Sequence, residues 1–195
     1  MHRWIIIGLA LLLAAFGVTE GNDGIVAWVF DIVGNHPLTD IWQPVYNPEP
    51  MDTYAYRPLS VVLLKIAAAL FGGHTMVWTA VHSLILVAYG LVSRRFLVLH
   101  GCREVWATVA TLGAMTMPSI LFSSWIPVEF DVVGATLVLA AANMLHNVEY
   151  NGTRGNWLRF GVLAFCALTI KETSALQLLA YLVAFAAMRH QEKMW

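Results

Sequence analysis

Two adjacent ionisable residues, Lys171 and Glu172, interrupt a long apolar run. Apart from Arg159, they are nearly the only charges between Trp157 and Met188. An ionisable side chain at membrane depth costs several kcal/mol unless it has a charged partner or reaches water. The chemistry open to these two residues is therefore charge pairing. Either they neutralise each other at an interface, or they line a polar cavity in which another charge can bind.

A second group of acids follows a turn in the segment SSWIPVEFD, residues 123–131. Its tryptophan and proline end one predicted helix at a membrane interface, and Asp131 lies where the next helix begins. The Asp131 carboxylate can therefore meet a helix N-terminus, where negative charge is favoured. One interpretation is that Asp131 caps the helix and Glu129 is hydrated. The other is that both acids share a polar outer cavity with Lys171 and Glu172.

Composition indicates the class of protein. Of the 195 residues, 59% are hydrophobic and only 12% are charged, which is far too apolar for a soluble domain of this size. The net charge of −1 gives no reason to expect nucleic acid as a partner. The two cysteines, Cys102 and Cys166, are isolated in the sequence and are interpreted as structural. We predict an all-α, polytopic membrane helix bundle.

Residues 1–75 are predicted to form one helix and a long outer loop. Trp4–Val18 is apolar, and because it lacks a small-residue cleavage site we predict a retained first helix (1–18) rather than a signal peptide. Residues 19–75 are rich in proline and acids, as expected of an ordered loop. Within this loop, the apolar segments Gly24–Gly34 and Pro58–Phe71 are predicted to lie along the membrane surface as helices.

Residues 76–195 are predicted to cross the membrane repeatedly. Crossings are expected at Met76–Val92, Trp106–Trp125 and Val132–Val148. The segment Leu158–Met188 has thirty-one residues, which is too long for a single crossing. A break at Lys171–Glu172 divides it into two helices that meet at the outer face. The whole chain, 1–195, is then one membrane domain with about six crossings.

The basic residues indicate how the bundle is oriented. If both termini and the loops 93–105 and 149–159 are cytoplasmic, eight of the eleven lysines and arginines are inside. These eight are Arg3, Arg94, Arg95, Arg103, Arg154, Arg159, Arg189 and Lys193. The other three are Arg57, Lys65 and Lys171. We expect a multi-pass protein of the inner (cytoplasmic) membrane of a bacterium, with both termini in the cytoplasm.

The order of several motifs resembles a known family. The motifs are Tyr56-Arg57-Pro58-Leu59, His82 in WTAVHSLILV, the segment PSILFSSWIPVEFD and the segment LTIKETSAL. With a long acidic outer loop after a first helix, they resemble the N-terminal membrane half of C-type glycosyltransferases. These enzymes depend on polyprenyl-phosphate sugars and include protein O-mannosyltransferases, aminoarabinose transferases and transferases with TPR tails. The resemblance covers nearly the whole chain and rests on the order and spacing of the motifs.

The resemblance implies a catalytic acid just after the first helix. The family has a pair of acids there, and this chain has Glu20-Gly21-Asn22-Asp23, so Asp23 is the closest match, Glu20 is the neighbouring acid and Asn22 replaces the first acid. A base at this place would deprotonate an acceptor hydroxyl so that its oxygen attacks the anomeric carbon, with the lipid phosphate as leaving group.

The resemblance also implies a phosphate site. Arg57 and Lys171 would hold the lipid phosphate, because guanidinium and ammonium groups form charged hydrogen bonds to phosphate oxygens. Supporting residues would be Tyr56, Glu129, Asp131 and Glu172. An interfacial, snorkelling Arg57 is the alternative. His82 is expected to be a helix-packing residue. No metal site is predicted and no cofactor is required, although a divalent cation is compatible with the acids.

Several function classes are consistent with these residues. The first is a membrane glycosyltransferase, or the truncated half of one, that uses a polyprenyl-phosphate sugar at the outer face. The second is a non-catalytic accessory subunit of a membrane complex built on the same half-bundle. A transporter with a polar outer cavity is a third class. The expected partners are membrane lipid, the polyprenyl-phosphate sugar and other membrane subunits, without nucleic acid.

Overall fold

The computed structural model describes residues 2–16, 45–47, 53–55, 58–71, 75–117, 120 and 130–192. Two short strands, β1 (Val45–Asn47) and β2 (Thr53–Ala55), pair antiparallel with Tyr46 opposite Tyr54. The helices are α1 (His2–Phe16), α3 (Pro58–Phe71), α4 (Thr75–Leu99), α5 (Glu104–Met115), α7 (Asp131–Tyr150), α8 (Arg154–Ile170) and α9 (Glu172–Glu192). The predicted all-α class is confirmed for these residues, and the small hairpin is an addition that the sequence did not indicate.

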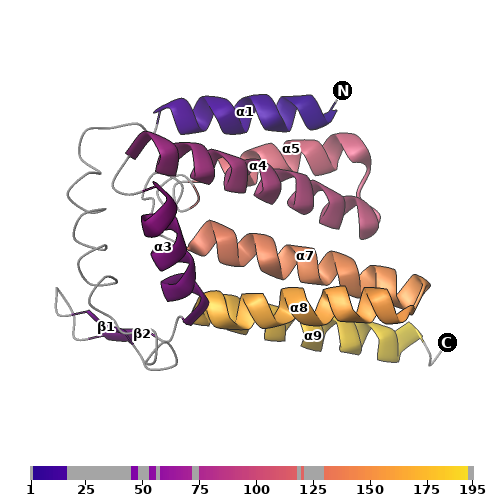
Figure 1. Ribbon diagram of the computed structural model, residues 1–195. Helices are drawn as coiled ribbons and strands as arrows, with labels where there is room; N and C mark the ends of the chain where they lie inside the picture. The colour runs from indigo at the N-terminus through magenta and orange to yellow at the C-terminus, as the bar shows by residue number, and fades with distance from the viewer. Residues whose placement is uncertain are drawn as a thin grey trace.

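The helices form a bundle with one crossing element (Figure 1). Helices α1, α4, α5, α7, α8 and α9 run back and forth along one direction, whereas α3 lies across one end. We call this the α3 end. The turns 100–103 and 151–153, the start of α1 and the end of α9 lie at the opposite end, which we call the turn end. The start of α1 and the end of α9 thus lie at the same end of the bundle.

Local signals set the two turns. Helix α4 ends because Gly101 adopts φ +86°, a left-handed conformation that costs glycine little. The amides of Gly101 and Cys102 donate to the carbonyls of Val98 and Leu97, at 3.1 and 3.0 Å, which satisfies the last carbonyls of the helix. Helix α8 begins at Thr153, whose hydroxyl accepts a hydrogen bond from the Asn156 amide at 3.3 Å.

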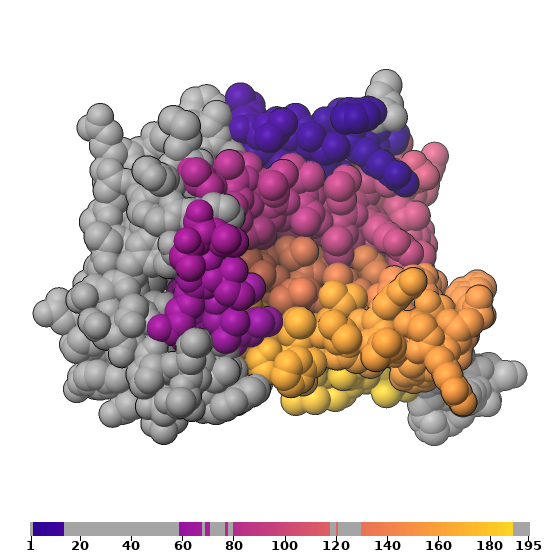
Figure 2. Space-filling view, in the orientation of Figure 1, coloured from indigo at the N-terminus to yellow at the C-terminus, as the bar shows by residue number. Residues whose placement is uncertain are grey.

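Helix α7 lies between the two halves of the bundle. One core cluster joins it to α1, α4 and α5 through Ile6, Leu86, Met115 and Val132. A second joins it to α8 and α9 through the apolar residues Val138, Ala141, Ala167 and Leu178. A third joins α3 to the ends of α7 and α8 through Val61, Leu64, Phe130 and Ile170. Figure 2 shows α3 packed against these ends.

Several predicted elements agree with the structure, but the predicted ends of α4 and α5 do not. Helix α7 matches the predicted crossing Val132–Val148, and α3 has the predicted bounds. The prediction that the preceding crossing ends at Val92 is wrong, because α4 continues to Leu99. Polar residues stay helical there because Arg94 forms a 2.8 Å ion pair with Glu104 and a 3.1 Å hydrogen bond to Thr108 of α5.

Two helices in the described part of the chain are long and apolar enough to cross a membrane. They are Ala80–Leu99 within α4 and Asp131–Tyr150, which is α7. Shorter apolar stretches occur at His2–Leu13 and Glu172–Met188. The predicted total of six crossings and the surface position of α3 stay predictions. The predicted helix Gly24–Gly34 lies outside the described residues. The prediction of one continuous helical crossing at Trp106–Trp125 is wrong, because α5 ends at Met115 and a turn follows at Thr116.

Candidate functional site

The candidate site is built on the junction between α8 and α9. Helix α8 ends at Ile170 and α9 begins at Glu172, so the predicted break at Lys171–Glu172 is confirmed. Between them Lys171 is extended, with φ −159° and ψ 143°. Its carbonyl accepts hydrogen bonds from the amides of Ser174 and Ala175, at 3.1 and 3.3 Å, which starts the new helix. The lysine is therefore held at a fixed point of the backbone.

Lys171 forms an ion pair with Asp131, the first residue of α7. Its Nζ lies 2.6 Å from Asp131 Oδ1. The side chain of Lys171 is 10% exposed, whereas that of Asp131 is 41% exposed. The N-cap position of α7 is Phe130, so Asp131 is the first helical residue, in the turn where negative charge is favoured. Its carboxylate also pairs with the buried ammonium of Lys171.

Helix α3 fixes the end of α8 beside this ion pair. The Ser60 hydroxyl donates to the Ile170 carbonyl at 2.5 Å. That carbonyl is one of the last in α8 and has no partner within its own helix. Ser60 is 3% exposed, so the bond is shielded from water and the lost backbone partner is replaced by a side chain. A residue that sequence reasoning did not single out therefore positions the residue just before Lys171.

Helices α7 and α9 approach each other closely near the Lys171–Asp131 ion pair. A Cβ atom at Gly134 would overlap the side chain of Ser174 and would come within 3.4 Å of Ile170 Cγ2. Gly134 is three residues after Asp131, and Ser174 is three residues after Lys171. Because residues three apart lie on one helix face, Gly134 shares a face of α7 with Asp131, and its contact with Ser174 is one helical turn from the ion pair. Small residues at such contacts let helix backbones approach closely.

The geometry allows the pair to bind an anion. An ammonium has three N–H donors, so Lys171 can contact Asp131 and a second acceptor at once. The partly exposed Asp131 keeps one side of the pair open to solvent. The sequence placed Lys171 and Asp131 at the same outer level, and the structure brings them into contact. Glu172, predicted to orient Lys171, is exposed in the first turn of α9.

The other predicted site residues are Glu20, Asp23, Tyr56, Arg57 and Glu129, and all five lie outside the described residues. Their convergence on Lys171 and Asp131 stays a prediction. His82 is buried within α4, as expected of a packing residue. Among the described residues, no group of three or more His, Cys, Asp or Glu side chains could hold a metal ion.

Comparison of the chain with protein-family models, curated proteins and solved structures finds no match.

Proposed function

We propose that this chain is a membrane protein that binds a polyprenyl-phosphate sugar at the α3 end and transfers the sugar to an acceptor hydroxyl. The observation that carries the proposal is the 2.6 Å ion pair between Lys171 and Asp131. It lies beside α3, whose first residue directly follows the Tyr56-Arg57 motif in the sequence. A buried, oriented ammonium next to a partly open carboxylate is a suitable element of a phosphate site.

Apolar side chains on the outside of the bundle support embedding in a membrane. Only 28% of the candidate span in α4 is buried, far less than expected for the core helix of a soluble protein. Large apolar side chains are exposed on the outer helices, including Trp4, Leu11, Trp106, Leu158, Phe165 and Leu179. Soluble proteins rarely expose so much contiguous apolar surface, whereas lipid covers it without cost. This surface supports a multi-pass arrangement with the α3 end outside.

In the proposed reaction, one set of residues binds the donor phosphate and another accepts the proton of the acceptor. Lys171 and Arg57 hold the phosphate of the donor, and Asp131 holds the ammonium in place. Asp23, with Glu20 nearby in the sequence, accepts the proton of the acceptor hydroxyl. The hydroxyl oxygen then bonds to the anomeric carbon, and the bond from that carbon to the phosphate oxygen breaks. The bond electrons leave with polyprenyl phosphate, whose negative charge the two cations stabilise.

A non-catalytic accessory subunit is the second candidate. The observation that favours it is the burial of Lys171, which is only 10% exposed and already paired. An ion pair held by Ser60 and Gly134 can fasten helices together without binding any ligand. In that case the ion pair only joins helices at the α3 end. The chain would then act as a structural subunit of a larger membrane complex.

A transfer assay separates the two candidates. Purified protein in lipid nanodiscs is incubated with a radiolabelled polyprenyl-phosphate sugar and a mixture of acceptors that carry hydroxyl groups, and the release of label from the lipid to an acceptor is measured. We expect release by the wild type and a loss of at least about a hundredfold in Asp23→Asn, since removing a general base costs this much. Asp40→Asn, an acid elsewhere in the same loop, is the matched control and keeps activity. Absence of release from folded wild type supports the accessory subunit.

A further inference from the structure

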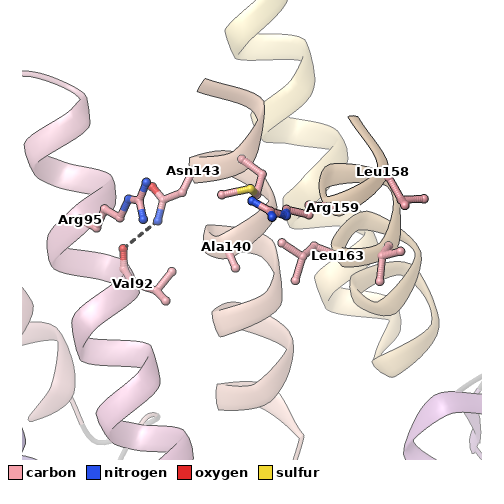
Figure 3. Close-up of a pocket in the computed structure, with 9 residues that line it drawn as sticks. Val92, Arg95, Ala140, Asn143, Leu158, Arg159 and Leu163 are labelled. Atoms are coloured by element: carbon pink, nitrogen blue, oxygen red, sulfur yellow. Dashed lines mark hydrogen bonds between the residues drawn. The ribbon is translucent and has the colours of Figure 1, made fainter. Parts of the chain in front are cut away.

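A hollow lies at the turn end, far from the ion pair, between α4, α7 and α8 (Figure 3). It has a volume of about 520 Å³. Its wall is mostly apolar, with Val92 from α4, Ala140 and Met144 from α7, and Leu158, Val162 and Leu163 from α8. Three polar residues complete it: Arg95, Asn143 and Arg159. Sequence reasoning used the two arginines only to orient the bundle and did not predict a pocket.

The polar residues of the hollow share one level along the bundle. Arg95 lies three residues beyond Val92 in α4, and Asn143 lies three beyond Ala140 in α7. Each step corresponds to about 4.5 Å along the helix toward the turn end. Helix α8 runs the other way, so its Arg159 also lies nearer that end than Leu163. Figure 3 shows Arg95, Asn143 and Arg159 together, with Val92, Ala140 and Leu163 below them.

Asn143 carries an acceptor that the described protein does not satisfy. Its side chain is 4% exposed, and its Nδ2 donates to the Val92 carbonyl at 3.1 Å. Its Oδ1 is buried and has no hydrogen-bond partner among the described residues. Buried polar atoms without a partner are rare, because each loses its bond to water without a replacement. Because this oxygen has almost no accessible surface, it lies behind the wall of the hollow and does not face a ligand there.

The charge of the hollow is positive. No acid lines it among the described residues, and neither arginine forms an ion pair there. The neighbouring Arg94 turns to the other side of α4, where it pairs with Glu104. Two guanidinium groups over an apolar wall match a molecule that has an anionic head and an apolar tail. Basic pockets between membrane helices on the cytoplasmic side recognise phospholipid head groups in this way.

We infer that this hollow is a binding site for one anionic phospholipid of the phosphatidylglycerol type. Its phosphate lies between Arg95 and Arg159, which donate charged hydrogen bonds to the phosphate oxygens. One acyl chain follows the apolar wall toward the middle of the bundle. This site shares only the membrane embedding with the proposed function and is independent of any chemistry at Lys171.

Native mass spectrometry of the purified full chain tests the inference. The protein is exchanged into detergent with phosphatidylglycerol or phosphatidylcholine, and lipid retention is measured. Wild type is expected to retain phosphatidylglycerol over phosphatidylcholine. Arg95→Gln and Arg159→Gln should each lower phosphatidylglycerol retention about tenfold, the effect of one charged hydrogen bond. Arg154→Gln removes an exposed arginine that does not line the hollow, and it should leave retention unchanged.

Further arms identify which part of the lipid is recognised. Free glycerol phosphate at millimolar concentration should not displace the lipid, because it lacks the apolar tail; displacement would mean a simple anion site and would overturn the inference. Equal retention by wild type and the Arg95→Gln/Arg159→Gln double variant overturns the inference outright.

Discussion

The ammonium of Lys171 lies 2.6 Å from the carboxylate of Asp131, which joins the α8–α9 junction to the first residue of α7. The two residues come from different helices and are each followed, three residues later, by the Gly134–Ser174 contact. A polar interaction and a tight backbone approach thus coincide at one end of the bundle. This arrangement has consequences for stability as well as for ligand binding.

The ion pair should behave as a coupled unit. Asp131→Asn leaves the buried ammonium of Lys171 without its charged partner, so it should lower the free energy of unfolding. Lys171→Met should be less harmful because it also removes the charge that needs the partner. We expect a coupling of about 1–2 kcal/mol in a double-mutant cycle, limited by the 41% exposure of Asp131. Denaturant unfolding in detergent measures it, and a coupling near zero would show that the contact does not stabilise the bundle.

The contact between Gly134 and Ser174 leads to a separate prediction about stability. Gly134→Ala places a Cβ atom against Ser174, and overpacking of this kind costs about 1–3 kcal/mol. Gly161→Ala in α8 is the matched control, because nothing lies within 4 Å of its added Cβ. The control should be neutral or stabilising by up to about 1 kcal/mol, the difference in helix propensity. Unfolding free energies of both variants give the comparison. Similar values for the two would contradict the close approach of α7 and α9.

Part of this fold could be predicted from the sequence. Apolar length alone placed α7 within two residues at each end and α3 at its bounds, and the excess length of Leu158–Met188 indicated the break at Lys171. The end of α4 could not be predicted in this way. Its polar residues Ser93–Arg95 resemble a helix end, and only the contact of Arg94 with Glu104 on α5 explains why the helix continues.

The site was predictable in position but not in its contacts. The order of the predicted crossings indicated that Lys171 and Asp131 lie on the same side of the membrane. It did not indicate whether Asp131 or Glu172 pairs with the lysine. That choice depends on how α7 packs against α8 and α9. The hollow beside Asn143 was missed for the same reason, since its wall comes from three helices. Its only signal in the sequence was Asn143, a polar residue in an apolar stretch of α7.

The orientation of the bundle predicts which sites are reachable from each side of the membrane. Cysteines introduced at Asp40 and at Gly155, in a background without Cys102 and Cys166, should be labelled by an impermeant thiol reagent from opposite sides. Gly155 lies at the turn end with the basic residues, which are predicted to stay in the cytoplasm. Labelling of intact and of opened cells measures this. Labelling of both positions from one side would rule out the topology.

Retention of polyprenyl phosphate by Lys171→Met is the most direct test of the phosphate site. This variant keeps much of the side-chain volume and removes the charge, so the bundle should fold while the lipid binds about tenfold to a hundredfold more weakly, the loss expected for one charged hydrogen bond. Lys65→Met on α3, a partly buried lysine of the same end, is the control and should retain the lipid as wild type does. Native mass spectrometry of the three folded proteins gives the comparison. A tenfold or greater loss in Lys171→Met alone is the predicted result, and equal retention by all three would contradict a role for Lys171 in binding phosphate.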